Sequence, residues 1–96
     1  MDPNQLPIPL LSPDPNSLQG KILTLLDDEH HYGKFPTQAE LSIRLEKSQQ
    51  LISHHLRTLQ KFGLVEKRKM GLKNRYKLTK EALFLLETDI DFKVKE

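Results

Sequence analysis

The chain contains no cysteine. This absence excludes disulfide bonds, thiolate metal sites and cysteine nucleophiles, and it disfavours a small secreted scaffold held together by disulfides. No apolar run approaches the roughly 20 residues that are needed to cross a bilayer. The first residues also lack the basic patch and apolar run of a signal peptide, so we expect an intracellular protein.

Arrangements of catalytic or metal-binding side chains are missing as well. Residues 27–29 form an acidic cluster, but no base, nucleophile or glycine-rich loop lies near it, so we interpret it as the solvated end of a helix. The histidines at 30–31 and 54–55 are adjacent pairs, and neighbouring residues of a helix point about 100° apart, which does not suit chelation. We therefore predict no enzyme, no metal site and no cofactor.

Charge is unevenly distributed along the 96 residues, which fit one small domain. Residues 44–80 carry eleven Lys or Arg against two acids, a net charge of +9. Residues 1–43 carry −4 and residues 81–96 carry −3, which gives the overall +2. This segregation indicates a polyanion-binding centre with acidic flanks. The alternative is a solvated basic surface without a partner.

Composition divides the chain into an arm, a domain and a tail. Residues 1–16 hold five of the six prolines, which favours an extended arm over helix or central strand. The arm either lies along a surface or serves as a proline-rich ligand. Residues 17–88 carry the periodic patterns of a folded domain. Residues 89–96 alternate apolar and polar side chains and form either a strand or a frayed helix end.

Two capped helices are predicted in the first half of the domain. Ser17 is a good N-cap for a helix over residues 18–29. Thr37 and Glu40 have the spacing of a capping box, in which each side chain satisfies a free backbone N–H, and we expect this second helix to end at about Leu45.

A third helix is predicted over residues 48–62, with Ser48 as its cap. At about 100° per residue, Ile52, Leu56 and Leu59 fall on one side, with His55 at the margin. Such an apolar face is typical of a helix that packs on a core.

The opposite side of this helix holds hydrogen-bonding and cationic side chains. Glutamine can pair with adenine edges, and arginine with guanine edges or phosphates. Leu51, at the edge of this face, either touches a thymine methyl or packs between helices. The alternative for the whole set is an ordinary polar surface. The candidate DNA-reading residues are Ser48, Gln49, Gln50, Ser53, His54, Arg57 and Lys61.

A β-hairpin and a last helix complete the domain. Residues 64–69 and 75–78 are predicted as strands around a tip at 70–74, and Thr79 caps a helix over 80–88. We call the hairpin of residues 64–78 the wing. The order of helix, helix, turn, helix, hairpin and helix predicts a mainly α structure with a small β-hairpin (α+β), the winged helix-turn-helix.

The wing is rich in cations, and these either contact DNA phosphates or protect exposed strand edges from aggregation. The lysines and arginines of the wing are Lys67, Arg68, Lys69, Lys73, Arg75 and Lys77. From this set we assign DNA contacts to Lys67, Lys69, Lys73 and Arg75.

Several segments resemble bacterial and archaeal winged-helix repressors of the ArsR and MarR type. The resemblance covers about residues 17–86 and is carried by residues 37–42, Ser48-Gln49, residues 53–59 and Gly63-Leu64-Val65. It implies a DNA-binding domain whose third helix enters the major groove while the wing lies over the adjacent minor groove or backbone.

The chain departs from that family pattern in its turn and in its metal ligands. Glu46 stands where the family usually has glycine, and a non-glycine residue at positive φ costs on the order of 1 kcal/mol. Lys47 replaces a usual apolar residue. The cysteine motif is absent and the terminal helix has no histidine, so the resemblance does not imply metal sensing.

We therefore predict a sequence-specific regulator of transcription that binds double-stranded DNA, acts as a repressor and works in the cytoplasm at the nucleoid. We expect a homodimer that forms through the first helix and residues 80–96. The alternative is a winged-helix module for protein–protein contact, or a scaffold of a replication or transcription complex.

Overall fold

The first helix, α1, spans Leu18–His31 in the computed structural model, which describes residue 14 and residues 16–88. Ser17 caps it as predicted, because its hydroxyl accepts a hydrogen bond from the Gly20 N–H at 3.1 Å. The helix runs two residues beyond its predicted end, and the chain turns only at Gly33, where φ is +69°. Most of the predicted arm 1–16 and the whole tail 89–96 lie outside the described residues.

Helix α2 spans Gln38–Leu45, and the capping box at its start is confirmed. The Glu40 N–H donates to the Thr37 hydroxyl at 3.1 Å, and the Thr37 N–H donates to the Glu40 carboxylate at 2.9 Å. Two backbone donors that a helix start would leave unpaired are therefore satisfied within the segment.

Helix α3 spans Gln49–Lys61, after a tight turn. Glu46 adopts the left-handed conformation, with φ of 58° and ψ of 45°, as expected for the residue that replaces the family glycine. The Ser42 hydroxyl donates to the Lys47 carbonyl at 2.5 Å and so holds the turn on α2. Gly63 follows the end of α3 with φ of +77°, the left-handed conformation in which glycine commonly ends a helix.

The wing consists of strands β1 (Val65–Met70) and β2 (Lys73–Leu78), paired antiparallel from Val65–Leu78 to Met70–Lys73. The predicted five-residue tip was too long, because only Gly71 and Leu72 form the turn. Gly71 has φ of +66° at the first turn position, a conformation that two-residue hairpins commonly require of glycine.

A short extended segment between α1 and α2 adds to the edge of the wing. Thr37 forms an isolated antiparallel bridge with Arg75, and the Tyr76 N–H donates to the Pro36 carbonyl at 3.0 Å. No signal in the sequence indicated the pairing of this segment with β2. The bridge ties the wing to the start of α2.

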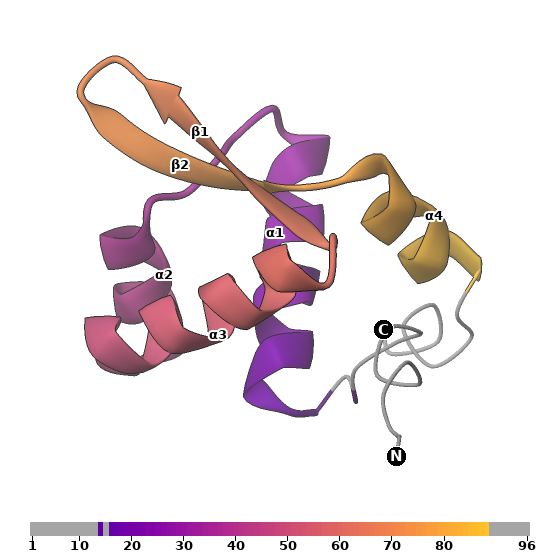
Figure 1. Cartoon of the computed structure of the whole chain (residues 1–96), viewed down its shortest axis with the longest axis horizontal. Coiled ribbons are helices and arrows are strands. Elements are labelled where there is room, and N and C mark those ends of the chain that lie inside the picture. The colour runs from indigo at the N-terminus through magenta and orange to yellow at the C-terminus, as the bar shows by residue number, and fades with distance from the viewer. Residues whose placement is uncertain (1–13, 15, 89–96) are drawn as a thin grey trace.

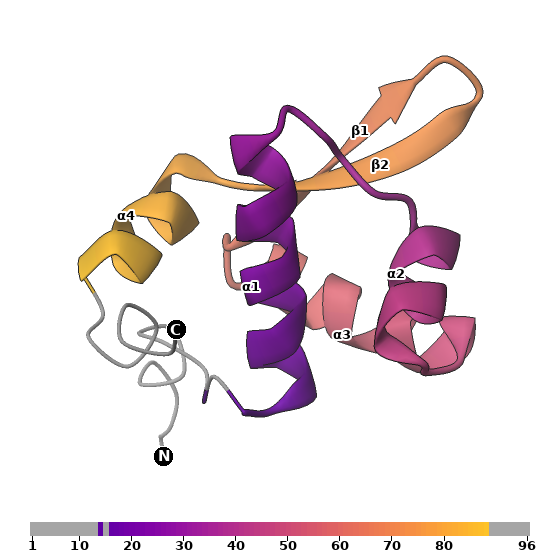
Figure 2. The same ribbon diagram turned by 180° about the vertical axis from the view of Figure 1, so that it is seen from behind.

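The last helix, α4, spans Lys80–Thr88, and Thr79 caps it through a hydrogen bond from the Ala82 N–H at 3.1 Å. In Figure 1, α3 and the wing lie in front of α1, and Figure 2 shows α1 in front from the other side. Helices and hairpin share one core of buried apolar side chains. Its members are Ile22, Leu23, Leu26, Leu41, Ile52, Leu56, Leu59, Leu64, Val65, Tyr76, Leu78, Ala82 and Leu86.

Replacing Glu46 by glycine should stabilise the protein. Glycine adopts φ of 58° without the clash that a side chain causes, so we expect Glu46→Gly to raise the free energy of unfolding by up to about 1 kcal/mol, less the backbone entropy that glycine loses on folding. Denaturant unfolding measures the difference.

Glu46→Ala is the matched control, because it removes the same carboxylate and keeps a Cβ at positive φ. It should not stabilise the protein. Equal stabilisation by both variants would mean that charge, not backbone strain, is responsible.

Candidate nucleic-acid interface

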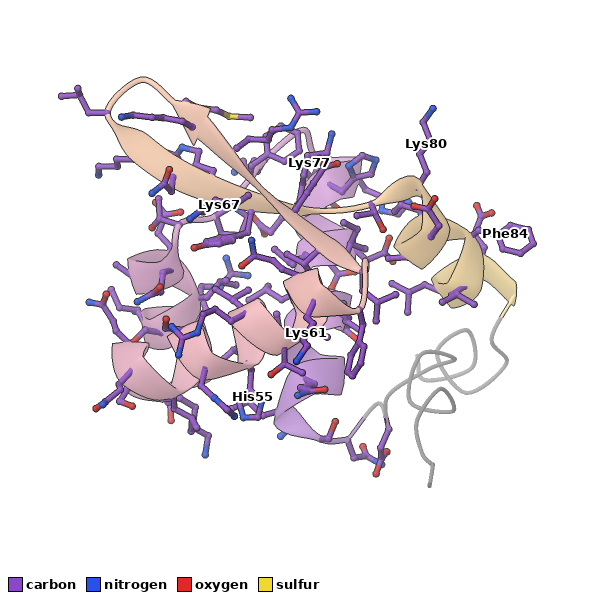
Figure 3. All side chains as sticks on the ribbon, in the orientation of Figure 1. His55, Lys61, Lys67, Lys77, Lys80 and Phe84 are labelled. Atoms are coloured by element: carbon purple, nitrogen blue, oxygen red, sulfur yellow. The ribbon has the colours of Figure 1, made fainter. Side chains whose placement is uncertain are left out.

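Helix α3 has two faces of opposite character. Ile52, Leu56 and Leu59 are 1% exposed or less and face the core. Gln50, His54, Arg57 and Lys61 are all exposed, and Lys61 is labelled near the end of α3 in Figure 3. The predicted division of this helix into an apolar and a polar face is confirmed.

The start of α3 is held against α2. The Ser48 hydroxyl accepts a hydrogen bond from the Leu51 N–H at 3.1 Å, so it acts as a cap in this structure. The Gln38 side-chain amide donates to the Gln49 carbonyl at 3.2 Å. Gln49 and Gln50 are themselves exposed, and they stand at the helix end that presents free N–H groups.

One pair on the outer face is already ordered. The Arg57 guanidinium donates to the Ser53 hydroxyl at 3.0 Å, one helical turn away. Ser53 is half-buried, whereas Arg57 is exposed. The hydrogen bond reduces the rotamers open to Arg57 without neutralising its charge. The guanidinium keeps further N–H donors for an acceptor outside the helix.

His55 links α3 to α1. Its Nδ1 lies 3.0 Å from the Gln19 side-chain amide nitrogen, which can donate a hydrogen bond to the neutral form of the imidazole. Burial lowers the pKa of His55, and the neighbouring His54 lowers it further. The two rings meet edge to face with their centroids 5.2 Å apart. As predicted, His55 is a half-buried helix residue, whereas His54 is exposed.

The cations of the wing lie on two faces, because side chains alternate along a strand. Lys67 pairs with Tyr76 across the ladder and Lys69 with Asn74, on the face that is buried at the base of the wing. Lys67 is labelled between the wing and the helices in Figure 3. Lys73 and Arg75 belong to the opposite face.

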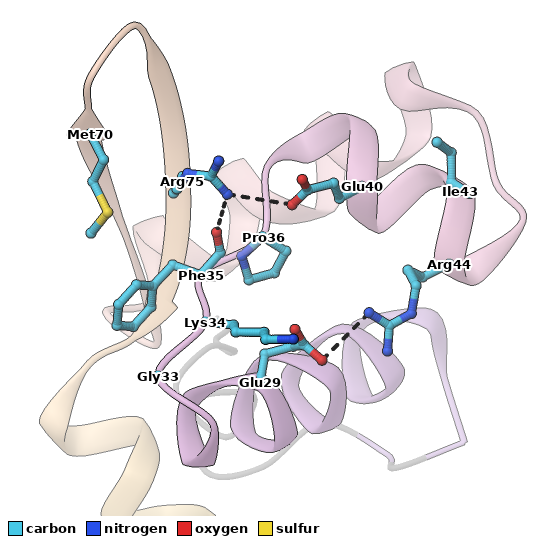
Figure 4. A pocket seen from close by; sticks show the side chains of 10 residues that line it. All are labelled: Glu29, Gly33, Lys34, Phe35, Pro36, Glu40, Ile43, Arg44, Met70 and Arg75. Atoms are coloured by element: carbon cyan, nitrogen blue, oxygen red, sulfur yellow. Dashed lines mark hydrogen bonds and ion pairs between the residues drawn. The ribbon is translucent and has the colours of Figure 1, made fainter.

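Among the wing residues assigned to DNA contacts, Arg75 is held by partners from the segment before α2 and from α2 itself (Figure 4). Its guanidinium donates to the Phe35 carbonyl at 2.8 Å and lies 3.5 Å from the Glu40 carboxylate. Lys67, Lys69 and Lys73 are exposed. An arginine that binds phosphate and one that ties a strand to a loop look alike in sequence, so no signal distinguished this residue.

The acidic cluster is only partly solvated. Glu29 is paired with Arg44 at 3.4 Å, and its side chain is only 17% exposed, so the interpretation of a solvated helix end is wrong for this residue. Across residue 14 and residues 16–88, no group of three or more metal-binding side chains lies together. No helix in the same part of the chain is long and apolar enough to span a membrane.

Residues 19–67 match the family described as "Bacterial regulatory protein, arsR family", which is half of the chain. The chain belongs to this family. The family and its fold are those of DNA-binding transcription regulators, not enzymes. No curated protein sequence matches the chain.

Solved structures share the fold of this arsR-family regulator. Reduced HlyU from Vibrio cholerae is 35% identical, with a TM-score of 0.59, over 73% of this chain and 70% of HlyU. A mutant of ZitR from Lactococcus lactis is 24% identical, with a TM-score of 0.64, over 72% of this chain and 46% of ZitR. AdcR from Streptococcus pyogenes is 22% identical, with a TM-score of 0.64, over 73% of this chain and 50% of AdcR. The chain therefore spans about half the length of ZitR and AdcR.

Stability should fall in mildly acidic solution because of His55. The pKa of this group is lowered from 6.5 in the folded protein, so the unfolded chain binds the proton more readily. Its contribution to the free energy of unfolding is full above pH 6.5 and is lost as the pH falls toward the folded-state value. The stability difference between wild type and His55→Gln should therefore shrink between about pH 8 and about pH 5, as measured by denaturant unfolding.

His31→Gln is a control of opposite sign. The pKa of His31 is raised from 6.5 by its hydrogen bond to the Asp27 carbonyl and then by the Asp27 carboxylate. The contribution of His31 to the free energy of unfolding is present below pH 6.5 and is lost as the pH rises through the raised value. The stability difference between wild type and His31→Gln should therefore grow as the pH falls. If the free energy of unfolding of His55→Gln depends on pH in the same way as that of the wild type, the interpretation of His55 is contradicted.

Proposed function

We propose that this protein is a homodimeric repressor that recognises a specific sequence of double-stranded DNA and works at the nucleoid. The observation that carries the proposal is the outer face of α3. Its side chains can bind bases and phosphates, and they are exposed because the opposite face is buried in the core. The major groove of B-DNA, about 12 Å wide, admits an α-helix.

The residues of α3 divide by chemistry in the proposed complex. Gln50 and His54 carry hydrogen-bonding groups suited to base edges. Arg57 suits guanine or phosphate, and Lys61 suits phosphate. The Ser48 hydroxyl, which caps the helix, would stay within the protein.

The wing supplies phosphate contacts beside the helix. Lys67, Lys69 and Lys73 are exposed and lie on the hairpin that extends past the helices in Figure 1. Arg75 would act in another way, because its bond to the Phe35 carbonyl fixes the angle between the wing and α2. Another mutant of ZitR, solved in complex with DNA, shares this fold at 24% identity and a TM-score of 0.62, which supports the proposal that this fold binds DNA.

In the proposed mechanism, repression results from binding of the protein to an operator that overlaps the promoter. Two copies related by a two-fold axis place two α3 helices in successive major grooves, about one helical turn apart, so the operator should be a pseudo-palindrome. A protein bound there blocks access of polymerase to a promoter that overlaps the site.

Substitutions in α3 and in the wing should have different effects on binding. Gln50→Ala and His54→Ala should relax sequence preference, with base-specific losses of about 1–3 kcal/mol. Lys69→Ala and Lys73→Ala should weaken binding to every sequence and reduce the slope of log affinity against log salt by about 1 each. Fluorescence anisotropy with duplexes selected from a random pool measures both quantities.

Two results would contradict the proposal. If the α3 variants and the wing variants lose DNA affinity equally, and to the same extent for every sequence, the assignment of base reading to α3 is wrong. Failure of the wild type to bind any duplex at low salt would remove DNA binding altogether and favour the scaffold alternative.

The proposed dimer rests on apolar surface near α4 and α1. Phe84 on α4 is 65% exposed and is labelled beside that helix in Figure 3. Tyr32, just after α1, is 79% exposed. Leu83 and Leu85 are only partly buried. An interface built from the same patch on two copies would be self-complementary.

The mass in solution tests the dimer. Analytical ultracentrifugation at tens of micromolar should give twice the chain mass of 11.2 kDa. Phe84→Glu should shift the protein toward the monomer, because it places a charge in the apolar interface. Ile43→Glu, at a site on α2 that is 76% exposed, is the control and should remain dimeric.

Removal of residues 80–96 should give a monomer or an unfolded chain that no longer binds its operator. A monomeric wild type at this concentration would contradict the dimer while leaving the DNA-binding proposal for the single domain intact.

A further inference from the structure

The tip of the wing presents an apolar side chain to solvent. Gly71 and Leu72 form the two-residue turn, and Leu72 is 97% exposed. Gly71 provides the positive φ that the turn requires, so the position of Leu72 is set by the hairpin itself. Met70, at the end of β1, points back along the wing toward Phe35 in Figure 4 and is only 39% exposed.

Exposed cations lie on both strands next to the turn that carries Leu72. Lys69 and Lys73 are exposed and flank the turn on the two strands, and Arg68 is exposed one residue further along β1. An isolated exposed leucine needs no explanation by itself. Here it stands at the end of a basic hairpin that projects past the helices, so a polyanion drawn to the lysines would meet Leu72 as well.

We infer that Leu72 is an apolar contact in the minor groove next to the α3 site and that it makes the protein prefer A·T over G·C pairs at that flank. This inference rests on the proposed DNA-binding function. It adds a specificity-determining residue outside α3. The lysines beside it attract DNA of every sequence alike, whereas the contact energy of an apolar side chain depends on the base edges at the floor of the minor groove.

The preference follows from the chemistry of the minor groove. A·T pairs present only acceptors there, whereas G·C pairs add the guanine 2-amino group as a donor. A leucine placed against that donor displaces its water without replacing the hydrogen bond, which is unfavourable. Leucine is also among the side chains that proteins insert between minor-groove base steps.

The test uses a duplex selected by the wild-type protein from a random pool, with the flanking pairs replaced as A·T, G·C or I·C. Inosine lacks the 2-amino group, so I·C resembles A·T in the minor groove. The wild type should bind the A·T and I·C flanks equally and the G·C flank about fivefold more weakly, which corresponds to about 1 kcal/mol. Leu72→Ser should bind all three alike.

Two control variants separate this contact from other effects. Ile43→Ser changes another exposed apolar residue, on α2, and should keep the flank preference. Lys73→Gln should reduce the salt dependence of binding and keep the flank preference. Leu72 is almost fully exposed, so its replacement should leave the circular dichroism and unfolding of the protein unchanged.

The outcomes distinguish this inference from the proposed function. If the wild type binds no duplex, the proposed function fails. If the wild type binds but discriminates no flank, or if Leu72→Ser discriminates as the wild type does, only this inference fails. Binding of the wild type, but not of Leu72→Ser, to phosphatidylglycerol vesicles, with no flank preference on DNA, would assign the tip to a membrane and also overturn it.

Discussion

The burial of one face of α3 determines which side chains of this helix the domain exposes to solvent. Ile52, Leu56 and Leu59 are 1% exposed or less, and truncation of such a side chain typically costs about 2–5 kcal/mol. That is a large part of the roughly 5–15 kcal/mol by which a domain is stable, so the rotation of α3 about its axis is not free. Because each residue turns the helix by about 100°, the same packing points Gln50 and His54 outward. The inner face of α3 is constrained by stability, whereas packing places no such constraint on the outer face, which we propose reads DNA.

The wing depends on a second constraint, its attachment to the segment before α2. The Tyr76 N–H donates to the Pro36 carbonyl at 3.0 Å, and Arg75 donates to the Phe35 carbonyl at 2.8 Å. The ion pair of Arg75 with Glu40 is partly exposed, and such pairs contribute only about 0–1 kcal/mol. The hydrogen bonds to main-chain carbonyls therefore hold the wing more than the ion pair does. Since Glu40 also caps α2, the hairpin and the start of α2 meet at the same few residues.

Local signals in the sequence predicted the helices well, because caps and apolar periodicity act over a few residues. Ser17, Thr37 with Glu40, and Gly63 all behave as their types and spacing indicate. The polar face of α3 was predictable for the same reason, although its contacts with DNA remain predictions. Pairings between distant segments were not predictable. The bridge from Thr37 to Arg75 and the hydrogen bond from Gln19 to His55 join positions that only the packed core brings together. The length of the hairpin turn was also missed, because the lysine and asparagine after Leu72 suit a loop as well as a strand.

Charge and shape make different contributions to the proposed recognition. Residues 44–80 carry a net charge of +9, and this attraction holds for any duplex and weakens with salt. A surface built only from lysine would therefore bind widely and discriminate poorly. Two of the exposed side chains to which we assign discrimination between base pairs, Gln50 and Leu72, are uncharged. Their contributions depend little on counterion release, so higher salt reduces non-specific binding more than it reduces discrimination.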